Sequence, residues 1–328
     1  MKDHPWPPPE GNVPDGAGNA PHAGDVRDPE QILPPTEQDV LDVVRAHLPG
    51  VPARSVALLG EGMDNVAYEV GGELVVRYGK DPSARVDLIA RETGLLRVVA
   101  EISPLPVPTP VFTDLGRGCW AYAKLPGVPL LSLPPSARAA RTTAIAAVLG
   151  GFLAALHAVP AGRVASLAGR DDDPLVTWRD EAAELHPSVG DVIPAAHRGA
   201  VEAFLTAPPP DDAPSLVFSH NDLGIEHVLM DPATGAVTGV IDWTDAALTD
   251  PAYDLGLLYR DLGPAALAAA LKAYRPPAPG PLRERAVFYA RCSVLEDLAY
   301  GVRTGLAAYT DKSLAALAWL FPPPSPGV

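Results

Sequence analysis

Cysteine is scarce in this chain of 328 residues, which contains only Cys119 and Cys292. Two cysteines cannot build the disulfide framework of a small secreted domain, and their spacing is not that of a metal site. Long apolar runs are also missing, since no stretch reaches the roughly 18 residues that a membrane-spanning helix needs. The first residues lack the apolar centre of a secretory signal. We therefore expect a reduced, cytoplasmic protein without a membrane partner.

Basic residues are outnumbered, with 25 Lys and Arg against 40 Asp and Glu and a formal net charge of −15. Binding to nucleic acid phosphates takes clustered Lys and Arg, so this composition argues against a nucleic acid partner. An acidic protein suits a cationic ligand better, although acidity can also serve solubility alone. Proline is in excess, because 39 residues are about 12% of the chain against an average of roughly 5%.

Proline marks a boundary near the start of the chain. Residues 1–36 contain nine of the 39 prolines and little periodic apolar pattern, which predicts a disordered tail. Residues 37–125 predict an N-terminal lobe in which a helix begins after Thr36. Three antiparallel strands fit residues 55–79, with a hairpin turn at two consecutive glycines, and a helix over 83–100 and two further strands follow.

Residues 126–328 are rich in Ala and Leu, a composition that predicts a larger helical lobe. Short strands are expected within 216–243. The sequence therefore predicts an α+β fold with a small antiparallel-sheet lobe followed by a larger, mostly helical lobe. Helices are expected over residues 137–158, 174–187, 194–206, 251–274 and 281–309.

The strongest chemical signal lies between residues 220 and 254. Asp222 follows an expected strand, and His227 begins the next one. Asp242 ends an apolar strand, where a carboxylate is costly to bury unless a positive charge meets it. A divalent cation held by His227 and Asp242 would meet it and keep positions open for phosphate oxygens, as Mg²⁺ prefers. Asp222 would then face a substrate hydroxyl.

A plainer interpretation remains open for each residue taken singly. Asp222, Asp245 and Asp254 would only cap turns, and His227 would be a hydrogen-bonded core histidine. This interpretation fits the whole group less well. A zinc site fits less well still, because the chain has no His-Glu-x-x-His helix motif.

The run from His220 to His227, followed by Ile241-Asp242-Trp243, resembles the catalytic and metal-binding segments of the aminoglycoside/macrolide phosphotransferases. The pattern of these antibiotic kinases is His-x-Asp, four residues, and then Asn or His; this chain has the His form. The segment from Asp250 to Asp254 matches as well, and the resemblance covers about residues 37–310. It implies a two-lobed, protein-kinase-like fold and an enzyme that phosphorylates an alcohol group.

The resemblance also implies roles for individual residues. Asp222 would be the catalytic base, and His227 and Asp242 would hold Mg²⁺. Asp254 would fix the catalytic loop through backbone hydrogen bonds, and His220 would be a scaffold residue. This agrees with the physics of phosphoryl transfer, which depends on positioning and charge neutralisation more than on covalent chemistry.

A nucleotide site is expected in the N-terminal lobe. The Gly60-x-Gly62 loop is neither a dinucleotide-binding fingerprint nor a P-loop, but it lies between two strands, where a kinase covers the nucleotide phosphates. Arg77, in place of the commoner Lys, would hold the phosphates and pair with Glu92. The donor would be ATP or GTP. The predicted nucleotide-binding residues are Gly60, Gly62, Asn65, Arg77, Glu92, Ala123 and Leu125.

The acceptor is expected to bind the helical lobe through acidic residues, which would attract a cationic, aminoglycoside-like antibiotic and make the enzyme a resistance determinant. Three alternatives remain open: a macrolide kinase, a metabolite kinase of the choline, homoserine or methylthioribose type, and a ligand-binding pseudokinase. Each acidic residue could instead lie on a solvated helix face. The predicted acceptor residues are Asp180, Glu181, Glu184, Asp245, Glu296 and Asp297.

Overall fold

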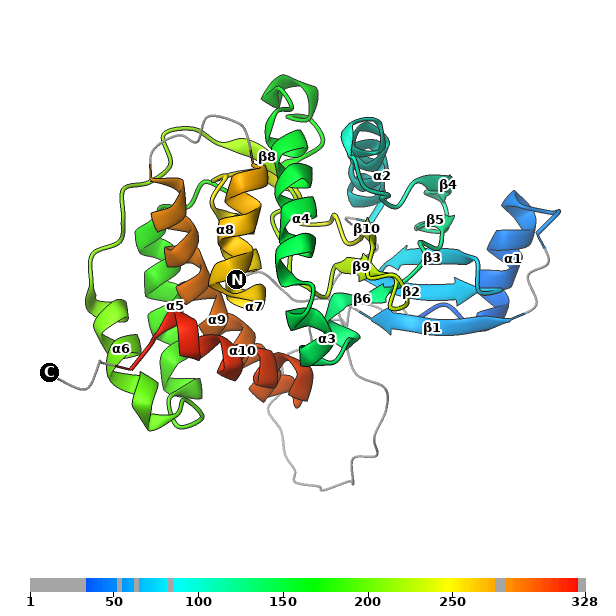
Figure 1. Cartoon of the computed structure of the whole chain (residues 1–328). Coiled ribbons are helices and arrows are strands. Elements are labelled where there is room, and N and C mark those ends of the chain that lie inside the picture. The colour runs from blue at the N-terminus through cyan, green and yellow to red at the C-terminus, as the bar shows by residue number, and fades with distance from the viewer. Residues whose placement is uncertain (1–33, 52–54, 62–64, 82–84, 275–280, 324–328) are drawn as a thin grey trace, which may run out of the picture. The chain divides into compact units, whose positions relative to one another are not determined.

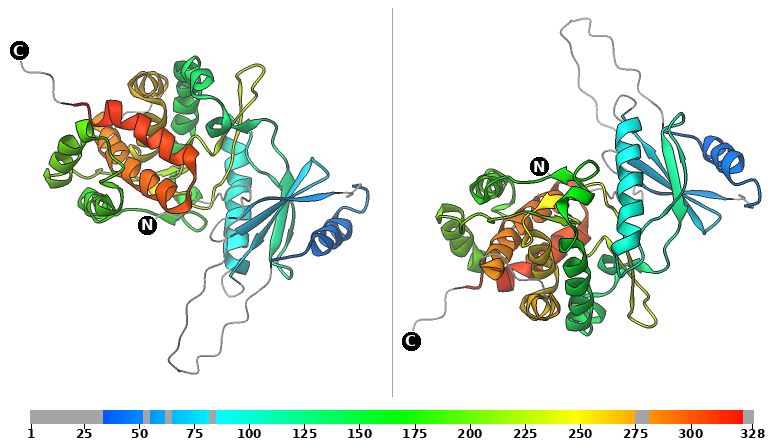
Figure 2. Two further views of the ribbon diagram at one scale, coloured as in Figure 1. Left: turned by 90° about the horizontal axis from the view of Figure 1, so that it is seen from below. Right: turned by 90° about the horizontal axis from the view of Figure 1, so that it is seen from above.

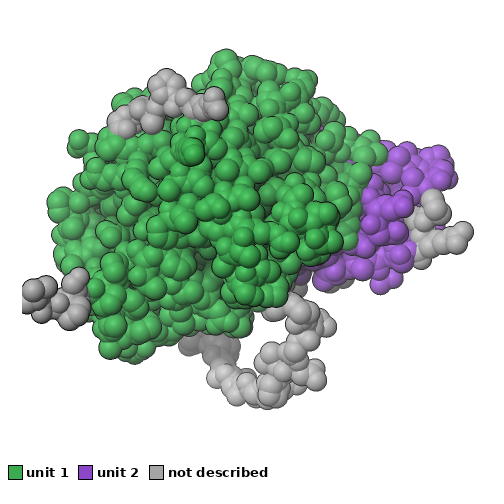
Figure 3. Space-filling view, in the orientation of Figure 1, with its two compact units in different colours: residues 1, 90–111, 122–328 green, residues 2–89, 112–121 purple. Residues whose placement is uncertain are grey.

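The computed structural model describes residues 34–51, 55–61, 65–81, 85–274 and 281–323. Its contacts divide the described chain into two compact units, shown in Figure 3. The smaller unit contains residues up to 89 and 112–121, and the larger one contains 90–111 and the chain from 122 onward. Residues 90–111, which the sequence assigned to the N-terminal lobe, thus group with the larger unit. Most of the predicted tail lies outside the described residues.

A five-stranded sheet organises the smaller unit, in the order β1-β2-β3-β5-β4. The three strands expected within 55–79 are confirmed, because β1 pairs with β2 and β2 with β3, both antiparallel. Gly71 and Gly72 form the turn with φ angles of 63° and 79°, which glycine adopts without steric cost. The strands are β1 (Val56–Glu61), β2 (Asn65–Val70), β3 (Leu74–Gly79), β4 (Pro110–Asp114) and β5 (Cys119–Ala123).

Helix α1 (Glu37–His47) begins at the predicted position. The Thr36 side chain accepts a hydrogen bond from the Asp39 backbone N–H, and the Asp39 carboxylate accepts one from the Thr36 N–H. This reciprocal capping box satisfies donors that a helix start leaves unpaired. The helix buries Val40, Val43 and Val44 in the core of the sheet unit. Helix α2 (Arg85–Ile102) follows β3.

Helices dominate the larger unit, and Figures 1 and 2 show α9 and α10 side by side. Gly263 and Gly305 separate consecutive helices with φ angles of 83° and 72°, values that suit a residue without Cβ. The single helix expected over 137–158 is wrong, because Arg141 has a non-helical φ of −121° and divides it. The helices are α3 (Pro135–Ala139), α4 (Thr142–His157), α5 (Leu175–Val189), α6 (Ala195–Thr206), α7 (Tyr253–Leu262), α8 (Pro264–Ala273), α9 (Leu282–Thr304) and α10 (Ala307–Leu320), with short 3-10 turns at Leu130–Ser132 and Ala161–Arg163.

Two small sheets carry the segment with the predicted chemistry. One has the order β10-β9-β6 and the other β7-β11-β8. The loop from β8 to β9 therefore connects the two sheets. None of the helices described is long and apolar enough to cross a membrane. The strands are β6 (Val128–Pro129), β7 (Gly169–Arg170), β8 (Val217–Ser219), β9 (Val228–Met230), β10 (Val237–Val240) and β11 (Ala247–Thr249).

Candidate active site

Asp222 lies in the loop between β8 and β9 and is only 7% exposed. The preceding Asn221 has a φ of 64°, in the left-handed region that Asn tolerates better than most residues. The Asn221 amide donates hydrogen bonds to a carboxylate oxygen of Asp171 at 3.0 Å and to the carbonyl of Asp245 at 3.1 Å. These contacts hold the backbone that presents Asp222.

Asp254, in the first turn of α7, holds the same loop from a second direction. Its carboxylate accepts hydrogen bonds from the backbone N–H of Asn221 at 2.9 Å and of Leu223 at 3.0 Å. It also accepts one from the Ser219 hydroxyl. Three donors thus satisfy the carboxylate of a residue that is only 1% exposed. The prediction that Asp254 fixes the loop through backbone hydrogen bonds is confirmed.

Asp261, which sequence reasoning missed, holds the far end of the loop. Its carboxylate accepts a hydrogen bond from the Ile225 backbone N–H at 3.1 Å. Asp261 and Asp254 are seven residues apart on α7, and about two turns of helix place them on one face. One helix therefore holds the β8–β9 loop on both sides of Asp222. The seven-residue spacing was the available signal, but acidic residues at helical spacing are common on solvated faces.

A buried chain of hydrogen bonds ends at the Asp254 carboxylate. Ser219 donates to Asp254, so its oxygen accepts from Nε2 of His157 at 2.9 Å, and Nδ1 of His157 accepts from the Tyr274 hydroxyl at 2.8 Å. Burial lowers the pKa of His157 to about 4, partly offset by the Asp254 carboxylate. The ring is therefore neutral at pH 7, as this chain of donors requires.

His227 and Asp242 lie together as the sequence predicts. Nδ1 of His227 donates to the Asp222 carbonyl at 2.8 Å. When the ring is neutral, its lone pair is therefore on Nε2, which lies 4.0 Å from an Asp242 carboxylate oxygen. Burial alone would lower the pKa of His227. The Asp222 and Asp242 carboxylates outweigh the effect of burial, so the pKa of His227 is raised. Asp242 has a φ of 59°, which turns the chain directly after β10.

This pair fits a magnesium site in which the protein supplies few ligands. Among the residues that the structure describes, no group of three or more His, Cys, Asp and Glu side chains is placed to hold a metal. One imidazole and one carboxylate leave most positions to phosphate oxygens and water, which is the pattern Mg²⁺ takes with nucleotides. A closed zinc site would need four protein ligands and does not fit.

His220 is fully buried beside this pair. Its Nε2 donates to the Ile241 carbonyl at 3.0 Å, and its ring contacts the Trp243 ring edge-on at 4.7 Å between centroids. Burial lowers the pKa of His220, so the ring is neutral. These contacts fit the scaffold role that the sequence suggested, because His220 links the β8–β9 loop to Ile241, which directly precedes Asp242.

The predicted nucleotide-binding residues are spread over both units. Gly60 is buried near the end of β1, beside an irregularity in its pairing with β2, and Asn65 begins β2 opposite Gly79. Arg77 is 9% exposed on β3, and its guanidinium lies 5.7 Å from the centre of the Trp120 ring. Glu92 belongs to α2 in the larger unit, whereas Arg77 belongs to the smaller one. Gly62 lies outside the described residues.

Ala123 and Leu125 lie where the chain leaves β5. Ala123 is the last residue of that strand and is exposed, and Leu125 is half-buried. A Cβ on Gly239 would come within 2.8 Å of the Leu125 side chain, so this segment packs closely on β10. Residues 123–125 thus follow the exposed end of β5 and lie close to β10, the strand before Asp242.

The predicted acceptor residues divide into two groups. Asp180, Glu181 and Glu184 are exposed on α5, Asp245 is half-buried after β10, and Glu296 is half-buried on α9. Asp297 is different: it is 0% exposed and pairs with Lys312 at 2.9 Å and Arg260 at 3.2 Å. Its predicted role in acceptor binding does not fit this position, because two buried cations already neutralise it.

The carboxylates of Glu296 and Asp222 both act on the buried Tyr253. Burial raises the pKa of Tyr253, and the carboxylates of Glu296 and Asp222 add to that effect. Burial also raises the pKa of Cys292, with further contributions from Glu296 and Glu181 that Arg179 opposes. Glu296 thus acts on both Tyr253 and Cys292.

Residues 55–286 match the model of a phosphotransferase enzyme family. Among solved structures, the chain is similar to the GDP complex of aminoglycoside 2'-phosphotransferase-IIIa, with a TM-score of 0.62, 21% identity, and 86% of this chain and 97% of that chain covered. It is also similar to macrolide 2'-phosphotransferase MphH from Brachybacterium faecium, with a TM-score of 0.56, 28% identity, and coverage of 85% and 97%. No curated protein sequence matches.

Proposed function

Because the chain belongs to the phosphotransferase enzyme family, we propose that it transfers the γ-phosphoryl group of ATP or GTP to a hydroxyl of a small molecule. The observation that carries this proposal is the arrangement of Asp222, His227 and Asp242 around one buried loop. The same observation disfavours a ligand-binding pseudokinase, because all three side chains of the reaction are present and held in place.

Asp222 is the catalytic base in this mechanism. Its carboxylate orients the acceptor hydroxyl and takes its proton as the hydroxyl oxygen attacks the γ-phosphorus. The bond between the γ-phosphorus and the oxygen that bridges it to the β-phosphate breaks, and the nucleoside diphosphate leaves. His227 and Asp242 would hold Mg²⁺, which when bound neutralises charge on the phosphates. Asp254 and Asp261 keep Asp222 in position, so little rearrangement is needed during the reaction.

The acceptor that we propose is a cationic, aminoglycoside-like antibiotic. Glu296 supplies negative charge near Tyr253, on which the Asp222 carboxylate also acts, and this favours an amine-rich acceptor whose hydroxyl reaches Asp222. The residues of this recognition would be Glu181, Glu184, Glu296 and Asp180, with Asp245 nearer the loop. Phosphorylation of such an antibiotic would give resistance.

A macrolide acceptor is the second candidate, favoured by one observation. The similar structure with the higher identity, 28%, is that of a macrolide 2'-phosphotransferase.

Nucleotide consumption with ATP and GTP, against a panel of aminoglycosides, macrolides and small metabolic alcohols, tests the proposal. We expect Mg²⁺-dependent phosphorylation of at least one antibiotic. Asp222→Asn should lower kcat by about 10³-fold, while nucleotide binding persists. The control Asp191→Asn changes an exposed carboxylate between α5 and α6 and should leave kcat unchanged. Full turnover by Asp222→Asn would refute the assignment of the base.

A further inference from the structure

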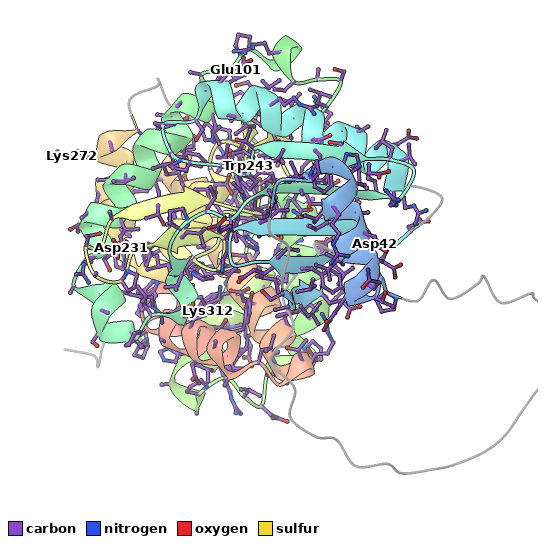
Figure 4. The ribbon with its side chains drawn as sticks, turned by 90° about the vertical axis from the view of Figure 1, so that its right-hand side faces the viewer. Asp42, Glu101, Asp231, Trp243, Lys272 and Lys312 are labelled. Carbon is purple, nitrogen blue, oxygen red and sulfur yellow. The ribbon has the colours of Figure 1, made fainter. Side chains whose placement is uncertain are left out.

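Five charged side chains form a buried cluster in the larger unit, behind the turn that carries His227. Each of these side chains is at most 6% exposed. They come from the catalytic loop, α7, α9 and α10, so segments far apart in the sequence meet here; Figure 4 labels Lys312 on α10. The members of this cluster are Glu226, Arg260, Asp261, Asp297 and Lys312.

Lys312 is central to the cluster. Its ammonium lies 3.1 Å from Glu226, 3.3 Å from Asp261 and 2.9 Å from Asp297. Burial alone would lower the pKa of Lys312, as Arg260 also does, but these three carboxylates outweigh both effects and raise it. The ammonium therefore stays charged, and α10 is tied to three other segments by one side chain.

Glu226 is the member of the cluster that belongs to the catalytic loop, and it directly precedes His227. Its carboxylate lies directly over Gly224, since a Cβ added to that glycine would come within 2.6 Å of the carboxylate. The His227 backbone N–H donates to the Gly224 carbonyl at 3.1 Å, which closes the turn. The Glu226 carboxylate therefore lies against Gly224, whose carbonyl accepts the hydrogen bond from the His227 backbone.

We infer that Lys312 and Glu226 position the turn of residues 224–227 and thereby set the affinity of His227 and Asp242 for a divalent cation. This inference rests on the proposed function. Lys312 and Glu226 are positioning residues, since they act through the backbone of His227. Residues that orient metal ligands from behind commonly change metal affinity by roughly 10- to 100-fold when they are altered.

The test measures Mn²⁺ affinity in the presence of ADP, from the electron paramagnetic resonance signal of free Mn²⁺, on the full chain. Glu226→Gln keeps the shape of the side chain and leaves two cations with two carboxylates, so no cation in the cluster loses its last partner. We expect Mn²⁺ affinity to fall about 10-fold, with affinity for ADP alone unchanged.

Asp297→Asn is the matched control. It removes one carboxylate from the same cluster, with the same change in charge, but Asp297 lies on α9 and not in the loop. We expect a similar loss of thermal stability and no loss of Mn²⁺ affinity. Lys312→Met combined with Glu226→Gln should lose less Mn²⁺ affinity than the sum of the two single variants, because the two side chains are in contact.

The inference is overturned if Glu226→Gln binds Mn²⁺ as the unaltered protein does, or if Asp297→Asn weakens binding equally. Either result would make the cluster a purely structural one and leave the proposed function intact. If the unaltered protein with ADP binds no Mn²⁺, the proposed metal site fails, and the inference fails with it.

Discussion

The two units use ion pairs differently. In the smaller unit, Lys80 and Glu61 pair at 2.6 Å with side chains that are 35% and 49% exposed. In the larger unit, Arg285 and Asp250 pair at 2.7 Å with side chains that are 0% and 4% exposed. Solvent screens the first pair, whereas removing one member of the second would leave an uncompensated charge in the interior. The larger unit therefore depends on its charges for folding and for the loop that carries Asp222.

Arg285→Met should produce the largest effect, because it leaves the Asp250 carboxylate buried without its cation. We expect the free energy of unfolding to fall by about 3–5 kcal/mol, measured by urea denaturation with an unchanged slope. The double variant Arg285→Met/Asp250→Asn should recover part of this loss. A loss below about 1 kcal/mol for Arg285→Met would place this pair with the exposed ones and remove the contrast between the units.

Acidification should affect the larger unit next. The pKa of His157 is about 4 in the folded protein, below its value of about 6.5 in an unfolded chain, so the unfolded state binds more protons between these pH values. His157 thus contributes stability that is present above about pH 6.5 and is lost as the pH falls towards 4, up to about 3 kcal/mol.

Urea denaturation at pH 7, 6, 5 and 4 checks this effect. The variant His157→Gln cannot gain the proton, so its stability should depend less on pH over the same range. Equal pH dependence of the two proteins would show that the proton is bound elsewhere. Tyr274→Phe removes the donor to Nδ1 without removing the ring, and it should keep most of the pH dependence.

Lys80→Met should give the smallest effect. We expect a change in unfolding free energy of at most about 1 kcal/mol, which shrinks further in 1 M salt because the pair is partly exposed. Denaturation at low and high salt measures it. A loss as large as that of Arg285→Met would show that exposure does not explain the difference between the two units.

Sequence patterns predicted best where the signal is local. The Thr36 cap, the Gly71-Gly72 turn and the strands of the smaller unit follow from neighbouring residues, and the structure has them. The motif around Asp222, His227 and Asp242 is local as well, and its members lie together. The division of the chain at residue 90 depends on long-range contacts, which no local pattern contains.

Buried charges were the harder part. Asp297 was expected to face an acceptor because an acidic residue in an apolar helix suggests a cleft, but its partners Arg260 and Lys312 come from other helices. The positions of Asp261 and Glu226 were not predicted for the same reason, since both pair with Lys312 from a distant helix. A single sequence does not indicate which cation will meet which carboxylate, so their role in holding the catalytic loop could not be derived from spacing alone.

The clamp on α7 has a consequence for how this chain can change in length. Asp254 and Asp261 hold the loop from one helix face, and each residue added between them would rotate the second carboxylate by about 100°. Insertions and deletions between Asp254 and Asp261 should therefore be rejected. Laboratory evolution that permits indels would reveal this interval as a segment of fixed length.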